Sequence, residues 1–447
     1  MNHTDPKPSS RRQFLRSSAF AGLTVLTAPN VVRGTEANSR LRMACIGAGG
    51  RAGAGIGPAL GQELVAVAEV DQARAAKSLE RIKKQAPGAK IYTDYRKLFD
   101  KHQDLDAVWV GTPDHNHFGA AVRALSAGAG VYCEKPLTWS MGEARRLADL
   151  AAEKKLATQM GNQGHSSEGI RLIVEYLRSG ALGPVKTVHT RSSKGWGAGT
   201  FKEGKKPAGL DWDSWLGPAA EMPYQSGPHP GSWRKYLDYG TGTLGDMACH
   251  TVDGAVWGLR LHEADWFEVE AEVGTPTEHG HPLDAHVIWN FPARGEMPPL
   301  TMTWRQRLDQ IKPEAIADEA SMKLAKDGTL YVGDEGYMAS NSHCGSVRLI
   351  PEAFQKQVGK PPKLIERVSG HTQDWLRAVQ DPDGPPPSSH FGYSSRLTEI
   401  VLAGVVAWRA GGKLKYDMKQ GKFTNSEAAN ALLWRKPRKG WEFGYPS

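Results

Sequence analysis

The chain has 447 residues, of which 40% are hydrophobic and 23% charged, and its formal net charge is +8. This composition is typical of a folded globular protein and excludes a largely disordered chain. The length exceeds what one average core accommodates and predicts about two or three domains. No stretch approaches the roughly 18 uncharged apolar residues that a membrane span needs. No dense run of Lys and Arg with interleaved aromatic residues indicates a nucleic-acid partner.

The first 38 residues have the pattern of an export signal. Arg11 and Arg12 are adjacent, and the run from Ser17 to Ala28 is uncharged and mostly apolar or small. Such a run is too short to span a bilayer but suits the apolar region of a twin-arginine signal. We therefore predict export to the periplasm, with the signal either removed or kept as an anchor. Residues 1–38 are left out of the fold prediction.

The four cysteines do not indicate a disulfide framework. Cys45, Cys133, Cys249 and Cys344 form no Cys-x-x-Cys pair and are widely spaced in the chain. Cys45 and Cys133 lie in apolar, strand-like runs, where a thiol behaves as a small hydrophobic group. We expect free thiols and no structural zinc site.

Residues 39–161 are predicted to form a doubly wound parallel sheet, because apolar runs alternate with amphipathic stretches. The expected strands are Arg42–Gly47, Leu64–Glu69, Ala89–Tyr92, Ala107–Gly111, Gly130–Cys133 and Ala157–Met160. The expected helices are Gln72–Gln85, Phe118–Ala127 and Met141–Lys155.

The first expected strand runs into a turn that suits a dinucleotide. Gly47, Gly49, Gly50, Arg51 and Ala52 belong to a Gly-x-Gly-x-x-Ala sequence between a strand and a helix. The glycines allow a tight turn and a close approach of the backbone to a pyrophosphate, and the small last residue lets the helix pack near the strand. An ordinary glycine-rich loop is the alternative.

An acidic residue follows at the spacing that such a turn requires. Glu69 ends the second expected strand 22 residues beyond Gly47. A carboxylate there can accept hydrogen bonds from the adenosine ribose and repels a 2′-phosphate, which favours NAD. Asp71 could share this role, and Arg74 leaves NADP open. A surface acid at the end of a strand is the alternative for Glu69.

Polar groups follow two further expected strands. Thr112, Pro113 and His117 come after the fourth strand, and Glu134 and Lys135 after the fifth. The carboxyl ends of parallel strands share one edge of the sheet, where open α/β sheets bind ligands. A lysine there can donate to a substrate oxygen. A surface Glu-Lys ion pair is the alternative.

In the second half, a glycine-rich loop leads into an expected helix with an acidic and histidine-containing face. Asp246, His250 and Asp253 have the spacing i, i+4 and i+7 and are predicted to share one face. They suit a general base that a neighbouring carboxylate orients. A helix-capping aspartate and a hydrogen-bonded buried histidine are the alternatives. A helical two-histidine metal site would need a second His where Gly254 stands, so no metal is predicted.

Residues 162–447 are predicted to form an α+β domain with a large, mainly antiparallel sheet and a last apolar helix at Leu397–Trp408. Its expected strands include Val185–Ser192, Phe267–Val273, Ala285–Asn290 and Leu300–Arg305. Residues 195–233 are loop-like and contain four tryptophans, which could form platforms for sugar rings or pack in a core or interface. These are Trp196, Trp212, Trp215 and Trp233.

Together these motifs resemble the Gfo/Idh/MocA family of nicotinamide-dependent oxidoreductases over nearly the whole chain after the leader. The resemblance implies that Lys135 contacts the reacting hydroxyl, His250 takes its proton, and Asp246 helps to bind and orient the substrate. The segments Gly161–Ser166 and Asp238–Gly242 are similar to those of an exported bacterial branch. That similarity implies substrate contacts for four residues, namely Asn162, Gln163, His165 and Asp253.

The resemblance implies an NAD(P)-dependent oxidoreductase that acts on a secondary hydroxyl of a sugar, glycoside or polyol. A glycosidase or keto-sugar lyase that oxidises its substrate transiently with NAD is the alternative, and a catalytically silent sugar-binding or dinucleotide-binding protein is a third hypothesis. A homodimer or homotetramer is expected from the resemblance. Because an exported enzyme cannot draw freely on cytoplasmic NAD, we also predict a tightly bound cofactor.

Overall fold

The computed structural model describes residues 40–317 and 319–446. The predicted twin-arginine segment therefore lies outside the described residues. Within the described part, none of the helices is both long enough and apolar enough to cross a membrane.

Six parallel strands form the first sheet, in the order β3-β2-β1-β4-β5-β6. This is the strand order of a dinucleotide-binding Rossmann fold. The prediction of a doubly wound parallel sheet is confirmed, and each strand lies within about a residue of its expected position. The strands are β1 (Arg42–Ile46), β2 (Glu63–Ala68), β3 (Lys90–Tyr92), β4 (Ala107–Val110), β5 (Gly130–Cys133) and β6 (Thr158–Met160).

The helices of this half pack on both faces of the sheet, as the amphipathic stretches predict. α4 starts at Asp114, four residues before the expected Phe118, because Pro113 is extended and lets the polar residues after it form the first helical turn. At the start of α5, the backbone N–H of Ser140 donates to Glu143 Oε2 at 3.0 Å, which is one of the two bonds of a capping box. The bounds are α1 (Ile56–Leu60), α2 (Ala76–Gln85), α3 (Tyr95–Lys101), α4 (Asp114–Ser126) and α5 (Met141–Lys154).

Nine strands form the second sheet, in the order β15-β14-β13-β7-β12-β11-β10-β16-β17. All neighbouring strands are antiparallel except β7 and β12, which confirms the large, mainly antiparallel sheet. The strands are β7 (Val185–Ser192), β10 (Trp266–Val273), β11 (Ala285–Phe291), β12 (Leu300–Gln306), β13 (Gly328–Gly333), β14 (Tyr337–Asn341), β15 (Val347–Ile350), β16 (Leu414–Asp417) and β17 (Lys422–Phe423).

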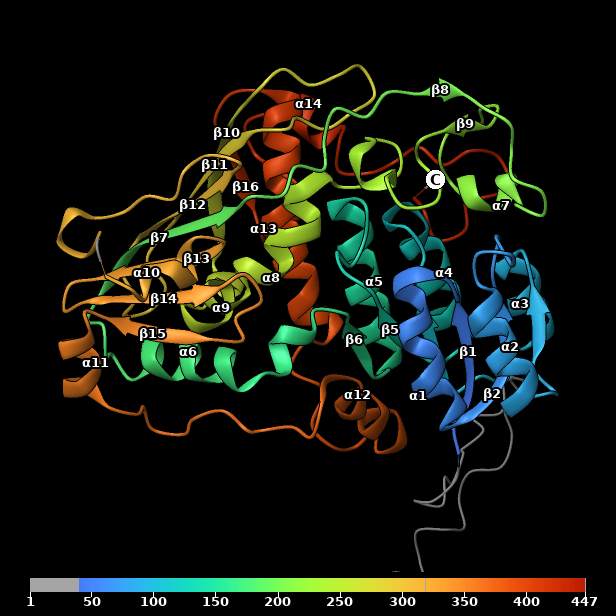
Figure 1. The fold of residues 1–447 in the computed structure, drawn as a ribbon, viewed down its shortest axis with the longest axis horizontal. Helices are drawn as coiled ribbons and strands as arrows, with labels where there is room; N and C mark the ends of the chain where they lie inside the picture. The colour runs from blue at the N-terminus through green and yellow to red at the C-terminus, as the bar shows by residue number, and fades with distance from the viewer. Residues whose placement is uncertain (1–39, 318, 447) are drawn as a thin grey trace, which may run out of the picture. The chain divides into compact units, whose positions relative to one another are not determined.

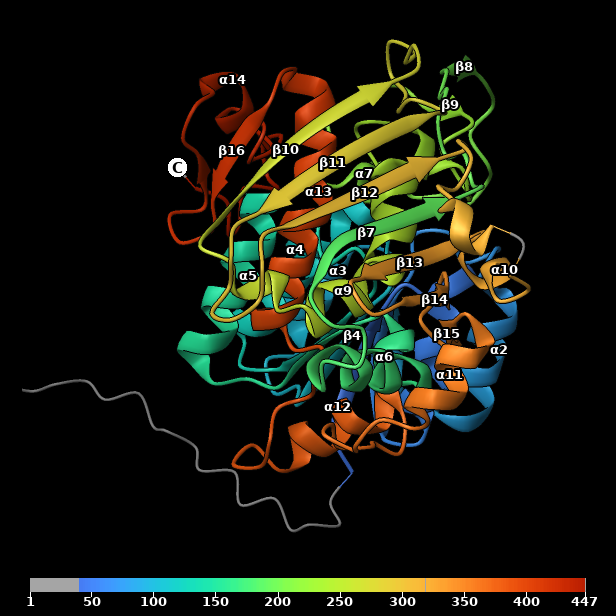
Figure 2. The ribbon, with the colours of Figure 1, turned by 90° about the vertical axis from the view of Figure 1, so that its left-hand side faces the viewer.

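One face of this sheet packs on helices, and no helix among the described residues covers the other (Figure 2). In β11 the buried Val287 and Trp289 alternate with the half-buried His286 and Ile288, as expected for a strand with one packed face. The packed face lies against α13 (Phe391–Ala410), whose Ile400 carbonyl accepts a hydrogen bond of 2.9 Å from Trp289 Nε1.

Helix α13 lies between the second sheet and α5 of the first half (Figure 1). One large cluster of buried apolar residues therefore contains residues of both halves along this helix. The other helices and short strands are α6 (Glu168–Arg178), β8 (Lys202–Glu203), α7 (Trp212–Leu216), β9 (Gln225–Ser226), α8 (Cys249–Thr251), α9 (Asp253–Gly258), α10 (Met322–Ala325), α11 (Glu352–Val358), α12 (His371–Gln380) and α14 (Glu427–Asn430).

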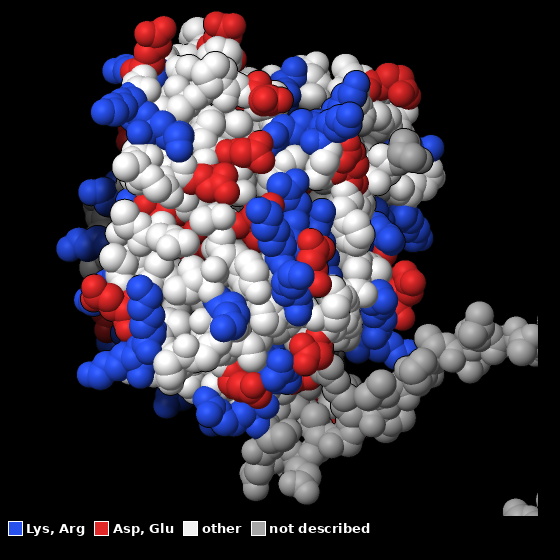
Figure 3. All heavy atoms as spheres, turned by 90° about the vertical axis from the view of Figure 1, so that its right-hand side faces the viewer, with Lys and Arg blue, Asp and Glu red and all other residues white. Residues whose placement is uncertain are grey.

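Acidic and basic side chains are mixed over the surface at the Rossmann end of the molecule (Figure 3). Neither sign of charge covers this face. All four cysteines are buried and free, as expected from their spacing. The division of the chain at residues 161 and 162 stays a prediction.

Candidate active site

A cavity of about 570 Å³ lies at the carboxyl edge of the parallel sheet. This volume is within the range of about 300–1,000 Å³ that is typical of ligand pockets. The structure places most of the predicted site residues around this one cavity. They are Gly47, Gly49, Gly50, Arg51, Ala52, Glu69, Thr112, Pro113, His117, Glu134, Lys135, Gln163, Asp246 and His250.

The glycine turn forms one end of the cavity, and its first position requires glycine. Gly47 has a φ of +94°, and a Cβ there would lie 2.9 Å from the Cβ of Ala52. Glu69 holds the turn in place, since its Oε2 accepts hydrogen bonds from the backbone N–H groups of Ala48 (2.8 Å) and Gly49 (3.0 Å). The carboxylate of Glu69 therefore lies at the cavity wall where the sequence predicts the adenosine ribose.

Asp71 does not reach the cavity, and the prediction that it shares the role of Glu69 is corrected. Its Oδ2 lies 2.8 Å from His229 Nε2, and its Oδ1 accepts from the backbone N–H of Arg74. The backbone of Asp71 also pairs with that of Leu210 in an isolated β-bridge, so both its backbone and its side chain contact the 195–233 segment. His229 lines the cavity in its place.

His117 joins the ends of β4 and β5 at the cavity. Its two ring nitrogens lie 2.8 Å from the carbonyl oxygens of Pro136 and Thr112. The hydroxyl Oγ1 of Thr112 is buried and has no hydrogen-bond partner among the described residues. A cavity wall with an unsatisfied hydroxyl fits a ligand that carries polar groups, such as a nicotinamide amide.

Lys135 and Asp246 also line the cavity and contact each other. Lys135 Nζ donates to the carbonyl oxygen of Asp246 (2.8 Å) and to its Oδ1 (2.6 Å). Arg234 Nε also donates to Oδ1, and Trp196 Nε1 donates to Oδ2. Burial alone would raise the pKa of Asp246, but the charges of Lys135 and Arg234 outweigh it and hold the pKa well below its usual value. Asp246 is thus an ionised carboxylate that accepts hydrogen bonds from Lys135, Arg234 and Trp196.

His250 lies beside this pair and is kept neutral. Burial and the nearby charge of Lys135 lower the pKa of His250 well below 6.5. Its Nδ1 is buried and has no partner among the residues that the structure describes. The ring stacks on His343, with 4.4 Å between the ring centroids. A neutral imidazole in a cavity can accept a proton at neutral pH.

The prediction that Asp253 shares the face of Asp246 and His250 is wrong. The stretch Leu244–Ala248 is a π-helical turn, which holds more residues than an α-helical one and rotates the side chains after it. The helix is also interrupted at Val252, between α8 and α9. Asp246 and His250 line the cavity, whereas Asp253 points into the protein behind them.

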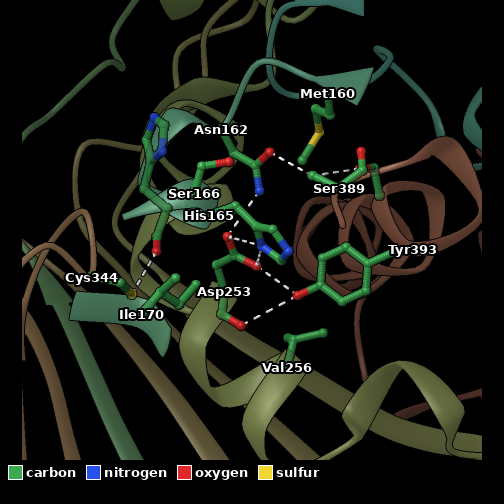
Figure 4. Close-up of polar contacts among 12 residues, drawn as sticks. Met160, Asn162, His165, Ser166, Ile170, Asp253, Val256, Cys344, Ser389 and Tyr393 are labelled. Atoms are coloured by element: carbon green, nitrogen blue, oxygen red, sulfur yellow. Dashed lines mark hydrogen bonds and ion pairs between the residues drawn. The ribbon is translucent and has the colours of Figure 1, made fainter. Parts of the chain in front are cut away.

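Asp253 is the centre of a buried polar network (Figure 4). Its carboxylate accepts hydrogen bonds from Asn162 Nδ2 (2.9 Å) and Tyr393 Oη (2.6 Å) and lies 2.9 Å from His165 Nδ1. Ser389 Oγ donates to Asn162 Oδ1. The prediction that Asn162, His165 and Asp253 contact substrate is therefore corrected. Their side chains are at most 2% exposed and join α9 to the turn after β6.

Gln163 faces the cavity, unlike its neighbours. Its Nε2 donates to Tyr132 Oη at 2.8 Å and to Glu134 Oε1 at 3.4 Å. Arg51 Nε also donates to this carboxylate oxygen, at 3.1 Å. Burial raises the pKa of Glu134, while the Arg51 charge opposes the rise. Glu134 thus connects the glycine turn to the end of β5.

Of the four tryptophans, Trp212, Trp215 and Trp233 are buried and pack in one cluster. The rings of Trp212 and Trp215 stack with centroids 4.7 Å apart. Trp196 is half-buried, and it lines the cavity together with Trp215 and Trp233. The cluster is a packed core that also forms part of the cavity wall.

Several cavity residues were not found from the sequence. Lys194, His229, Arg234 and His343 come from connecting segments of the second half, with Arg234 in a short 3-10 helix at Trp233–Lys235. Lys194 and His343 follow the ends of β7 and β14 by two residues, but those strands belong to the second sheet, so only the folded structure brings these side chains to the cavity.

Family comparisons agree with this geometry. Residues 41–162 match the model of the Gfo/Idh/MocA oxidoreductase family described as an NAD-binding Rossmann fold, and residues 173–290 match its C-terminal alpha/beta domain. The chain belongs to this family. The Rossmann half of this Gfo/Idh/MocA protein is therefore an NAD-binding domain.

Individual relatives match shorter segments. The chain is 26% identical to levoglucosan dehydrogenase of Pseudarthrobacter phenanthrenivorans over 36% of this chain and 35% of the relative. It is 30% identical to inositol 2-dehydrogenase of Salmonella typhimurium over 34% of this chain and 43% of the relative. The match thus spans less than half of either relative.

Solved structures share the fold over a longer range. A levoglucosan dehydrogenase complex with NADH and levoglucosan matches with a TM-score of 0.53 and 18% identity, over 84% of this chain and 99% of that one. The aldose-aldose oxidoreductase of Caulobacter crescentus, complexed with glycerol, matches with a TM-score of 0.54 and 17% identity, over 84% and 99%.

Proposed function

We propose that the protein oxidises a secondary hydroxyl of a sugar, glycoside or polyol with NAD as the hydride acceptor. The observation that carries this proposal is that Lys135, Asp246 and a neutral His250 line the same cavity as the glycine turn. The named dehydrogenases among the relatives act on compounds of this class.

The cavity residues fit NAD. Gly47 keeps the turn open for a pyrophosphate, Glu69 lies where ribose hydroxyls would bind, and Thr112 has a free hydroxyl at the wall. When bound, NAD would accept the hydride that leaves the hydroxyl-bearing carbon. The carboxylate of Glu69 would repel the 2′-phosphate of NADP, which supports NAD as the preferred cofactor.

Lys135, Asp246 and His250 would position the reacting hydroxyl and take its proton. The Lys135 ammonium, fixed by Asp246, would donate a hydrogen bond to the reacting oxygen and stabilise its negative charge. His250 would take the hydroxyl proton because its imidazole is neutral at pH 7. Asp246 orients Lys135 through an ion pair of 2.6 Å between side chains that are 12% and 8% exposed.

Contacts between the halves support tight cofactor binding. The backbone N–H of Asp211 donates to the Val70 carbonyl at 2.9 Å, and His229 pairs with Asp71 at 2.8 Å. Both contacts hold the 195–233 segment over the end of β2, where the adenosine would lie.

Export through the twin-arginine leader and assembly into a dimer or tetramer are parts of the same proposal.

The experiment is a turnover assay on the purified full chain. Sugars, glycosides and polyols are added with NAD, and NADH is followed by its absorbance while the products are identified. NADH together with a ketone product supports the proposal. Release of an aglycone without net NADH supports instead the glycosidase or lyase that oxidises its substrate transiently. Binding of NAD without any product formation supports the silent binding protein.

A further inference from the structure

Three cationic side chains surround one carboxylate at the catalytic end of the cavity. Lys135 Nζ and Arg234 Nε donate to Asp246 Oδ1 at 2.6 and 2.9 Å. Lys194 Nζ lies 3.8 Å from Asp246 Oδ2. The single negative charge of Asp246 therefore faces three positive charges. One ion pair would be enough to hold Lys135, so the other two cations need a separate explanation.

The other acids of the cavity do not balance this excess. Glu134 is already bonded to Arg51 at 3.1 Å, on the side of the glycine turn. Asp114 accepts hydrogen bonds from the backbone N–H and the hydroxyl of Thr241. It lines the cavity but is only 1% exposed, and burial raises the pKa of its carboxyl above the usual value, which favours the uncharged form.

The pyrophosphate of a dinucleotide does not account for the excess either. Two other arginines, Arg51 and Arg74, line the end of the cavity that the glycine turn forms. The Arg74 guanidinium lies 3.6 Å from where a Cβ of Gly50 would stand. The three cations around Asp246 lie instead with His250, where the substrate would react.

Arg234 and Lys194 each have N–H groups that do not donate to Asp246. The hydrogen bond of Arg234 to Asp246 uses only Nε, and its guanidinium lies 4.0 Å from the ring centroid of Trp233, which fixes its direction. The side chain of Lys194 is 52% exposed and reaches Asp246 only at ion-pair distance. A guanidinium fork and an ammonium are the groups that proteins use to bind carboxylates and phosphates.

We propose that the substrate is an anionic sugar, whose carboxylate or phosphate is bound by Arg234 and Lys194 while Lys135 contacts the reacting hydroxyl. This inference rests on the proposed function and names its substrate class. A neutral sugar would displace water from Arg234 and Lys194 without supplying a negative partner, and that desolvation disfavours it.

The test measures binding and turnover separately on the NAD-loaded full chain. Glucose, glucuronate and glucose 6-phosphate, and then galactose and galacturonate, are titrated by calorimetry. NADH absorbance is followed in parallel samples. We expect an anionic sugar to bind at least about tenfold more tightly than its neutral parent, because hydrogen bonds to charged groups are the stronger ones. The glucuronate and phosphate arms distinguish a carboxylate from a phosphate.

Matched variants test whether Lys194 contributes to the preference for an anionic sugar. Lys194→Gln is expected to reduce the preference for the anion by about threefold or more, as for loss of a partly exposed ion pair. Lys154→Gln, on the exposed last turn of α5, is expected to leave it unchanged.

The proposal is overturned if neutral sugars bind as tightly as their anionic partners or if no anionic sugar binds saturably. Anion-selective binding without NADH supports the inference and contradicts hydride transfer. NADH from neutral sugars alone supports hydride transfer and contradicts the inference.

Discussion

Lys135 donates to two oxygens of Asp246 at once, the backbone carbonyl at 2.8 Å and the carboxylate Oδ1 at 2.6 Å. These residues are 111 positions apart and come from the two halves of the chain. The end of β5 and the π-helical turn are thereby joined through their side chains. In the proposed reaction, this contact fixes the ammonium that faces the substrate oxygen.

Replacing this ammonium tests its role. Lys135→Met is expected to lower the rate of hydride transfer by about 100-fold or more, which is typical for loss of a positioned proton or charge donor. NAD binding should persist because the glycine turn is untouched. Single-turnover NADH formation and NAD titration measure the two effects. Lys154→Met, on the exposed end of α5, is the matched control, and unchanged turnover of Lys135→Met would contradict the assignment.

The pH dependence of oxidation reports on His250. Because burial and Lys135 lower the pKa of His250 well below 6.5, the base-competent neutral form is present above that lowered pKa. We expect kcat/KM for sugar oxidation to remain flat as the pH falls through 6.5 and to decrease only at lower pH. A rate profile with circular dichroism at each pH checks this. A half-maximal rate at or above pH 6.5, with the fold intact, would contradict a neutral His250.

The glycine turn is tested by adding one methyl group. Gly47→Ala places a Cβ 2.9 Å from that of Ala52 at a φ of +94°, so the turn must change shape. We expect NAD affinity to fall by about tenfold or more, since a misplaced turn loses several backbone contacts to phosphate. Gly88→Ala is the control, because a Cβ at Gly88 meets no atom within 4 Å. Equal NAD affinity in the two variants would argue against this turn as the cofactor site.

The contact between Asp71 and His229 is expected to slow cofactor release. In His229→Gln, the imidazole that pairs with the Asp71 carboxylate at 2.8 Å is lost and the 195–233 segment is held less firmly. We predict that bound nucleotide is released about tenfold faster, which corresponds to about 1.4 kcal/mol and is reasonable for one buried charge-assisted bond. Nucleotide retained after desalting measures this. His286→Gln, on the second sheet, is the control and should release nucleotide as the wild type does. Equal release rates in His229→Gln and the wild type would contradict a role of the Asp71–His229 contact in cofactor retention.

Asp253 is expected to affect stability rather than substrate affinity. Asp253→Ala leaves His165, Asn162 and Tyr393 without their common acceptor in a buried site. Loss of such a partner costs about 3 kcal/mol or more of unfolding free energy. Denaturant unfolding and KM measured at a temperature where the variant is folded separate the effects. A large rise in KM with unchanged stability would restore the original prediction of a substrate contact.

Much of the Rossmann half could be predicted from the sequence because its signals are local. A buried parallel strand is a short apolar run, and Gly47, Glu69 and Lys135 each follow such a run within two residues. The edge of the sheet then brings the three together without any further information. In the second sheet, β7 matches its predicted bounds because of another local signal, the alternation of buried and half-buried residues from Val188 to Ser192.

The errors occurred where position depends on distant contacts. The direction of Asp253 depends on a π-helical turn, which has no residue signature that separates it from an α-helix. Asp71 is drawn away by His229, 158 positions later in the chain. Arg234 lies in a short 3-10 helix and Lys194 in a loop, and neither has a sequence pattern that predicts its contact with Asp246.

The central claim is that this cavity passes a hydride from a sugar to a nicotinamide. The most direct measurement is to purify the full chain, identify nucleotide released on denaturation by mass spectrometry, and follow the reduced-nicotinamide absorbance of the native protein as sugars are added. We predict bound NAD or NADH whose redox state changes with a sugar in the wild type and not in Lys135→Met. Absence of bound nucleotide, together with no uptake of added NAD or NADP, would contradict the account.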